Sequence, residues 1–124
     1  MKLRIKGNSL RFRLTEPDVE KLTKEGSLEE RTQFGTNELL YSLHKLPGSN
    51  EMTASFNGNK ISLFIPESFL KDWFVNDVVG FQSQMPLSSS GSLSLLLEKD
   101  FTCLEESVED QSDNYRNPKS ICQP

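Results

Sequence analysis

The chain has 124 residues, and its 14 Lys and Arg stand against 18 Asp and Glu, which gives a formal net charge of −4. This length is typical of one domain, large enough to bury a core without a disulfide or a metal. Charged residues make up 26% of the chain, so composition excludes a disordered chain, a coiled coil and a disulfide scaffold. The acidic balance also argues against a nonspecific nucleic-acid binder, because such proteins present a dominant basic patch.

The N-terminal residues predict a cytoplasmic protein with no membrane partner. Residues 1–6 alternate charged and apolar types, whereas a secretion signal needs an uninterrupted apolar stretch. Purely apolar runs such as Leu95–Leu97 are far too short to span a membrane. In a reducing cytosol, Cys103 and Cys122 are expected to be thiols rather than a bridge.

Alternation of residue types predicts two strands near the N-terminus, at residues 2–6 and 10–14. Gly7-Asn8-Ser9 between them can form a turn, so we expect a hairpin, or one strand bent at Gly7. Apolar side chains would share one face of this hairpin. Five basic side chains would share the other face: Lys2, Arg4, Lys6, Arg11 and Arg13.

A short helix is predicted to follow this hairpin. Thr15 can cap it, Pro17 is tolerated in its first turn, and Asp18 favours the positive end of the helix dipole. Gly26 is placed to end it. A helix of about ten residues is too short to be stable alone, so it must pack on a sheet.

The rest of the chain predicts more strands and a second helix. Pro66-Glu67 indicates a helix start and Asn76-Asp77 its end, with Phe69, Leu70, Trp73 and Phe74 on one helical face. Asn57-Gly58 predicts a hairpin turn. Alternating residues predict further strands at residues 28–34, 39–44, 52–56, 61–65, 78–82 and 93–97.

These elements predict a single α+β domain over residues 1–104. Most connections are too short for parallel crossovers, so we expect a mainly antiparallel, strongly twisted sheet or partly closed barrel of about eight strands, with two short helices. The order ββα, ββ, ββα, ββ is compatible with an internal duplication. Residues 105–124 lack periodicity and predict an acidic C-terminal tail, either packed on the domain or partly disordered.

The basic hairpin face is the first candidate site. Neighbouring antiparallel strands place side chains of one face about 5 Å apart, so these cations repel one another unless an anion neutralises them. That anion is either an external ligand, such as an anionic molecule or an acidic protein, or the chain's own acidic C-terminus. The proposed binding residues are Arg4, Lys6, Arg11 and Arg13.

A metal site is the second candidate. Thiolates are zinc ligands, and Cys103 and Cys122 flank the carboxylates Asp110 and Asp113. The chain has no C-x-x-C pair and no EF-hand spacing, so two unrelated thiols or a conditional disulfide are the alternatives. We expect no cofactor, with zinc as the one metal that these residues suit.

The sequence favours a protein that is not an enzyme. It has no Gly-x-Ser-x-Gly elbow and no glycine-rich phosphate loop. His44, the single histidine, is expected on the polar face of its strand as an ordinary surface residue.

The two ends of the chain resemble a family of short bacterial proteins of unknown function. The similarity rests on MKLRIKGNSLRFRL at 1–14, EKDFTCL at 98–104 and EDQSDNY at 109–115, and it covers nearly the whole chain. It implies a free-standing bacterial protein whose acidic tail belongs to the domain, and it carries no activity over.

The leading hypothesis is a non-enzymatic binding or interaction domain. Its basic hairpin would be the binding surface, and residues 105–113 would cover that surface until a better anion displaces them. The alternative is a small metal-binding protein, possibly an enzyme, that uses Cys103, Cys122 and tail carboxylates. A homo-oligomer is also open, because edge strands can pair between chains.

Overall fold

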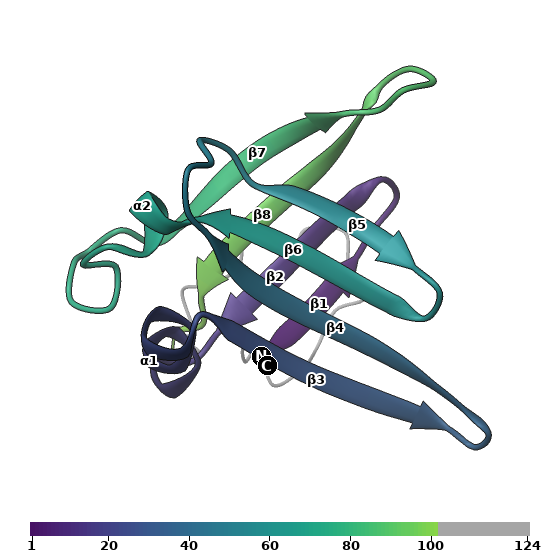
Figure 1. The fold of residues 1–124 in the computed structure, drawn as a ribbon, viewed down its shortest axis with the longest axis horizontal. Helices are drawn as coiled ribbons and strands as arrows, with labels where there is room; N and C mark the ends of the chain where they lie inside the picture. Colours follow the sequence, from purple (N-terminus) through teal and green to yellow (C-terminus); the bar gives the residue numbers. More distant parts are fainter. Residues whose placement is uncertain (102–124) are drawn as a thin grey trace, which may run out of the picture.

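The computed structural model describes residues 1–101, which form eight strands and two helices (Figure 1). Residues 102–124 lie outside the described part of the chain. The elements are β1 (Lys2–Ile5), β2 (Ser9–Leu14), α1 (Glu16–Glu25), β3 (Ser27–Phe34), β4 (Asn37–Leu46), β5 (Thr53–Asn57), β6 (Lys60–Pro66), α2 (Glu67–Leu70), β7 (Gly80–Pro86) and β8 (Ser92–Lys99).

The strands form two mixed sheets rather than one. Sheet A has the order β1-β2-β8-β7, and sheet B has the order β3-β4-β6-β5. The sheets pack face to face with their strands crossing steeply in Figure 1, as in orthogonal sandwiches. The α+β class and the predominance of antiparallel pairs are confirmed. The partly closed barrel is not found, because the two sheets stay separate.

A parallel pair of strands lies at the centre of each sheet. In sheet A, β2 pairs with β8, and in sheet B, β4 pairs with β6. The short connections predicted a mainly antiparallel fold, and these two pairs are the parallel exceptions within it. β4 and β6 are joined through β5, and β2 and β8 are joined through seven elements, so neither pair consists of consecutive strands.

The first hairpin and the first helix form as their residues predict. Alternation in β2 buries Leu10, Phe12 and Leu14, which are at most 8% exposed. The capping box of α1 is complete: the Thr15 N–H donates to Asp18 Oδ2 at 3.0 Å, and the Asp18 N–H donates to Thr15 Oγ1 at 3.3 Å. The helix ends at Gly26, whose φ of 85° is the left-handed conformation that glycine favours.

The second helix is much shorter than predicted. It ends at Leu70 after one turn, and the chain then turns at Asp72, where φ is 63°. The expected apolar face is therefore split: Trp73 is fully buried, whereas Phe74 is 41% exposed. The Trp73 Nε1–H donates to the Val78 carbonyl at 2.7 Å, which holds the irregular segment after the helix against the core.

The core lies between the two sheets and continues beneath α1. Its largest fully buried side chains are all apolar, and they come from both sheets, from α1, and from α2 and the segment after it. These side chains are Phe12, Leu14, Val19, Leu22, Leu43, Met52, Leu63, Ile65, Leu70, Trp73, Leu95 and Leu97.

The strand order shows that the fold consists of two equivalent halves. Unit 1, residues 2–46, contains β1, β2, α1, β3 and β4, and unit 2, residues 53–99, contains β5, β6, α2, β7 and β8. When each element of unit 1 is exchanged for its counterpart in unit 2, sheet A becomes sheet B. The duplication that the sequence order suggested is thus present in the topology.

In the first hairpin and the helical region of each unit, buried positions correspond at a spacing of 51 residues. Gly7-Asn8 recurs as Gly58-Asn59 at the same turn. Five buried residues of unit 1 have buried counterparts in unit 2: Leu10 and Ile61, Phe12 and Leu63, Leu14 and Ile65, Val19 and Leu70, and Leu22 and Trp73.

Hydrogen bonds that join the units are also repeated. The Asn8 side-chain amide donates to the Ser92 carbonyl at 2.7 Å, and the Asn59 amide donates to the Glu38 carbonyl at 2.8 Å. The Ser94 N–H donates to Asn8 and the Leu40 N–H to Asn59, at 3.0 and 2.9 Å. The two units are therefore equivalent in their contacts as well as in their topology.

Candidate functional site

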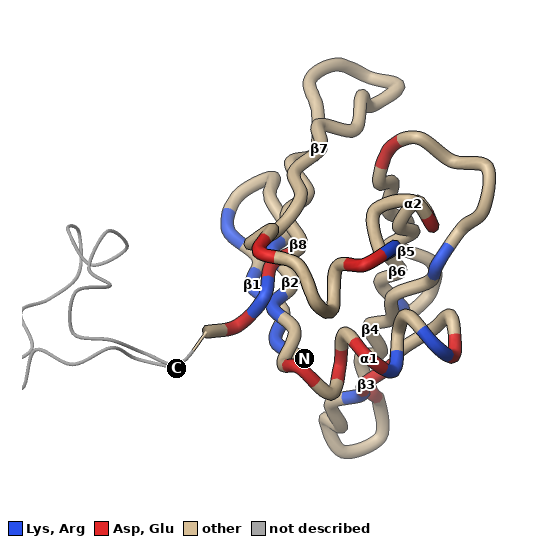
Figure 2. Tube along the Cα trace, turned by 90° about the vertical axis from the view of Figure 1, so that its left-hand side faces the viewer, with Lys and Arg blue, Asp and Glu red and all other residues tan. Residues whose placement is uncertain are grey.

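The predicted basic residues gather on the outer face of sheet A. In the β1–β2 hairpin, Lys2 lies opposite Arg13 and Arg4 lies opposite Arg11, while the apolar side chains of β2 are buried in the core. Figure 2 shows the Lys and Arg of β1 and β2 together on one side of the molecule. We call the following residues the basic face: Lys2, Arg4, Lys6, Arg11 and Arg13.

Two acidic residues from the other end of the described chain enter the basic face. Because β8 runs parallel to β2, Glu98 lies beside both arginines of that strand, with its Oε1 3.5 Å from Arg11 Nε and 3.4 Å from Arg13 Nε. Asp100 Oδ2 lies 3.1 Å from Lys2 Nζ. Within the described residues, five cations therefore face two carboxylates.

The sequence placed these two carboxylates among the acids of the C-terminal part that could attract the basic end, but it did not predict which cations they contact. The alternation of Leu93, Leu95 and Leu97 directs Glu98 to the outer side of its strand. The strand order was the missing information, since nothing in the sequence predicted that β8 pairs with β2.

The equivalent outer face of sheet B carries none of these cations. The positions 51 residues after the basic face have the same place in the fold but uncharged side chains. They are Thr53, Ser55, Asn57, Ser62 and Phe64.

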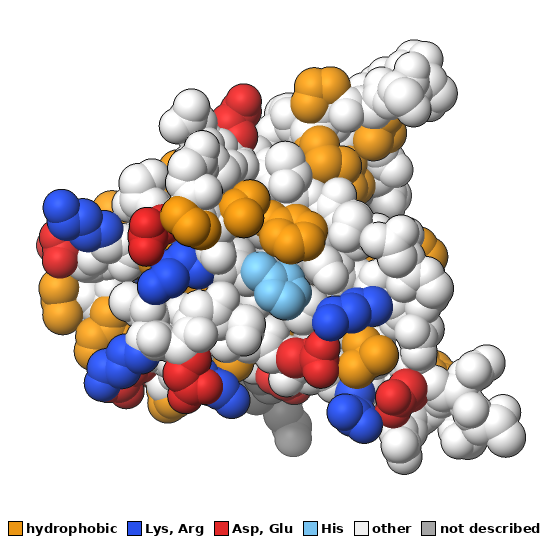
Figure 3. Space-filling model, in the orientation of Figure 1, with side chains coloured by type: hydrophobic (Ala, Val, Ile, Leu, Met, Phe, Trp, Pro, Cys, Tyr) orange, Lys and Arg blue, Asp and Glu red, His pale blue; other side chains and the backbone are white. Residues whose placement is uncertain are grey.

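His44 lies on this outer face of sheet B, as predicted. Its ring stacks on Phe64 with centroids 5.3 Å apart, and its Nε2 lies 2.9 Å from Ser42 Oγ, which is 3.2 Å from Ser62 Oγ. Figure 3 shows the histidine near the middle of the face, between apolar and charged side chains. Burial of the ring, with Lys60 nearby, lowers the pKa of His44 below its ordinary value.

The pair of Ser42 and His44 does not form a nucleophilic site. Ser42 is only 1% exposed, so a substrate atom cannot reach its hydroxyl. Glu29, the acid near the imidazole, lies with its Oε2 2.9 Å from Lys60 Nζ instead. The geometry indicates a structural hydrogen-bond chain rather than a catalytic one.

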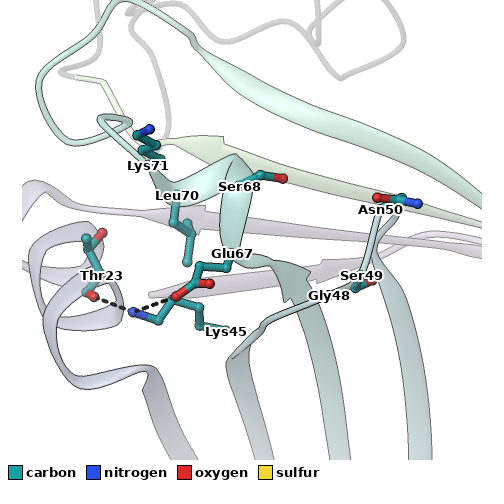
Figure 4. A pocket seen from close by; sticks show the side chains of 9 residues that line it. All are labelled: Thr23, Lys45, Gly48, Ser49, Asn50, Glu67, Ser68, Leu70 and Lys71. Atoms are coloured by element: carbon teal, nitrogen blue, oxygen red, sulfur yellow. Dashed lines mark hydrogen bonds and ion pairs between the residues drawn. The ribbon is translucent and has the colours of Figure 1, made fainter.

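An open cleft of about 550 Å³ lies between the end of α1, the loop after β4 and α2 (Figure 4). Lys45 Nζ donates to the Thr23 carbonyl at 3.0 Å and lies 4.0 Å from Glu67 Oε2. At the equivalent position, Lys99 Nζ donates to the Asn76 carbonyl at 2.7 Å and sits 5.6 Å from the centre of the Trp73 ring. Lys45 therefore binds the last turn of α1, and Lys99 binds the irregular segment after α2. The ion pair with Glu67 offsets the charge of Lys45 in the cleft.

The proposed metal ligands cannot be placed. Cys103, Asp110, Asp113 and Cys122 all lie outside the described residues. Within residues 1–101, no cluster of three or more His, Cys, Asp or Glu side chains could hold a metal ion.

A comparison with models of protein families places most of the chain in one family. The model of a family of unknown function (DUF7009) matches residues 1–119. No curated protein and no solved structure matches the chain. Among the described residues, no helix is long and apolar enough to cross a membrane.

Proposed function

The chain belongs to this family of unknown function, and we propose that it is a binding domain whose basic face binds acidic segments of a partner protein. The observation that carries the proposal is the difference between two equivalent faces. Sheet B folds in the same way with five uncharged residues where sheet A has five cations. The fold therefore does not require the cations, and their mutual repulsion is a cost that binding of an anion offsets.

Carboxylates are the anions that the face is seen to accommodate. Glu98 and Asp100 already lie among the cations at 3.1 to 3.5 Å. A guanidinium can donate to carboxylate oxygens from several N–H groups at once, so Arg4, Arg11 and Arg13 can each contact more than one acid. An extended acidic segment would add carboxylates along the hairpin without displacing Glu98.

The chain's own acidic segment, residues 105–113, is the natural competitor for this face. The described chain leaves β8 at Lys99, and Asp100 then contacts Lys2 at the edge of the basic face. Residues that follow so closely have a high effective concentration there. We propose that they weaken binding of external acids until a segment of higher charge displaces them.

The binding proposal is tested with a poly-glutamate peptide at low ionic strength. In the main variant, Arg4→Ser and Arg11→Ser install the serines that unit 2 has at the equivalent positions. The control, Lys21→Ser with Lys71→Ser, removes the same charge from exposed positions elsewhere. We expect the main variant to lose most of the affinity and the control to retain it. Equal losses would show a nonspecific charge effect, and preference for polyphosphate over poly-glutamate would show a phosphate site instead.

The role of the acidic segment is tested by ending the chain after Leu104. We expect this truncation to raise the affinity of the basic face for poly-glutamate and to change the thermal stability. If neither quantity changes, the segment does not cover the face. The metal-binding alternative is tested separately by metal analysis of untagged protein, with Cys103→Ser expected to release the metal if Cys103 is a ligand.

A further inference from the structure

The two units make the core of the molecule together, and neither could bury its apolar side chains alone. Each unit places its first hairpin in one sheet and its second hairpin in the other. The central pair of each sheet, β2 with β8 and β4 with β6, joins one strand of each unit. The contact between units therefore includes both parallel ladders and the apolar core between the sheets.

Only one covalent connection joins these intimately packed units, the segment of residues 47–52. It is a surface turn with Pro47, with Gly48 at a φ of 79°, and with exposed Asn50. The Ser49 hydroxyl donates within the turn, to the Glu51 carbonyl at 3.0 Å. Met52, which is 1% exposed, marks the point where unit 2 enters the core. An extended form of this turn would leave the contacts between units unchanged.

We propose that the turn at residues 47–52 is a hinge: at its natural length it keeps the two units of one chain together, and when it cannot close, two copies of the chain associate by exchanging units. Unit 1 of one copy then packs on unit 2 of the other, in a closed two-fold dimer. Each half of the dimer reproduces both parallel ladders, so the dimer and the monomer differ in the turn at residues 47–52. This inference does not depend on the proposed function.

The length of the turn decides which form is favoured. Leu46 and Thr53 flank β6 on opposite sides, since they pair with Pro66 and Phe64. Strands are about 4.8 Å apart, so the turn must bridge roughly 10 Å while passing around the end of β6. The natural segment is long enough for this path, and it keeps the two units of one chain at high effective concentration.

The test is deletion of residues 48–51. The remaining Pro47 and Met52 span at most about 11 Å when fully extended, which leaves no path around β6. We expect light scattering to give twice the mass of the monomer, with an unchanged circular dichroism spectrum. The control inserts four Gly and Ser residues after Gly48 and should remain a monomer. A folded monomer after the deletion would overturn the proposal.

A second measurement applies if the deletion variant does not fold. A protease site inserted between Ser49 and Asn50 allows the full, folded chain to be cut in the turn. We expect the two pieces to remain together at the mass of the uncut chain, to separate in denaturant and to reassemble when it is removed. Pieces that fall apart after cleavage, or that cannot refold together, would overturn the proposal.

Discussion

Arg13 and Glu98 form an ion pair of 3.4 Å across β2 and β8, at the two positions where sheet B has Phe64 and His44. In sheet B the same strand geometry brings the two rings to 5.3 Å. The repeated fold thus holds a charged pair on one outer face and a stacked ring pair on the other. The strand pairing of this fold therefore does not require a charged pair at these positions.

Removal of the Glu98 charge is expected to strengthen binding of acids. Glu98→Gln deletes the carboxylate nearest to Arg11 and Arg13, so the affinity for poly-glutamate should rise several-fold. The ion pairs are partly exposed, so the free energy of unfolding should fall by only about 0–1 kcal/mol. Glu20→Gln on α1 is the matched control, because Glu20 pairs with Lys24 away from the basic face. Isothermal titration of both variants would contradict the prediction if they bound equally well.

Patterns among neighbouring residues predicted the helix and strands whose formation depends on interactions between neighbouring residues. Alternation located the strands, and the helix-start residues Thr15, Pro17 and Asp18 located α1, because both patterns arise from residues close together in the chain. The length of α2 was wrong, since Trp73 is buried through an irregular segment that mimics helical spacing. The parallel pairs could not be predicted, because they join residues such as Leu10 and Leu95 that are far apart in sequence.

In the candidate site, too, features set by residues close together in the chain were predictable, and features set by tertiary pairing were not. The basic face follows from alternation in one hairpin, and the cations were therefore predictable. Glu98 and Asp100 reach them through tertiary pairing, and Ser42 and His44 meet Phe64 in the same way. The contrast with sheet B became visible only when the topology showed that the residues 51 positions apart are equivalent.

Trp73 is expected to contribute much more to stability than its neighbour Phe74. The Trp73 side chain is fully buried and donates to the Val78 carbonyl, whereas Phe74 is 41% exposed. Trp73→Leu installs the residue found at the equivalent position 22, and it should lower the free energy of unfolding by about 2–4 kcal/mol. Phe74→Leu should change it by less than about 0.5 kcal/mol. Urea unfolding followed by circular dichroism compares them, and equal costs would contradict the assigned burial.

The two turn asparagines are expected to contribute equally to stability. Asn8 and Asn59 donate equivalent hydrogen bonds to the opposite unit, at 2.7 and 2.8 Å. Each Asn→Ala variant should lose about 0.5–1.5 kcal/mol of unfolding free energy. The double variant should lose the sum to within about 0.5 kcal/mol, because the turns belong to different sheets. Asn57→Ala, beside the second turn, is the control. Denaturant midpoints that differ markedly between the two single variants would show that the turns are not equivalent.

His44 is expected to make stability depend on pH in a window below neutrality. Burial of its ring, followed by repulsion from Lys60, lowers its pKa below the ordinary value of 6.5, while Glu29 acts in the opposite direction. The folded state therefore disfavours the protonated form. The resulting stability is complete above pH 6.5 and is lost as the pH falls through the lowered pKa of the folded state. Lys60 from β6 and Glu29 from β3 are the charged groups that set the shift.

The measurement compares the thermal unfolding of the natural chain and His44→Gln from about pH 7.5 to about pH 5.5. The natural chain should lose more stability than the variant over this range. Glu29 does not produce this difference, because Lys60 lowers its pKa below the ordinary value of 4.5, and the variant retains it. The chain has a single histidine, so its proton resonance reports the titration directly. If the two chains lost stability in parallel, or if the histidine titrated with a midpoint at or above 6.5, the folded state would not disfavour protonation of His44.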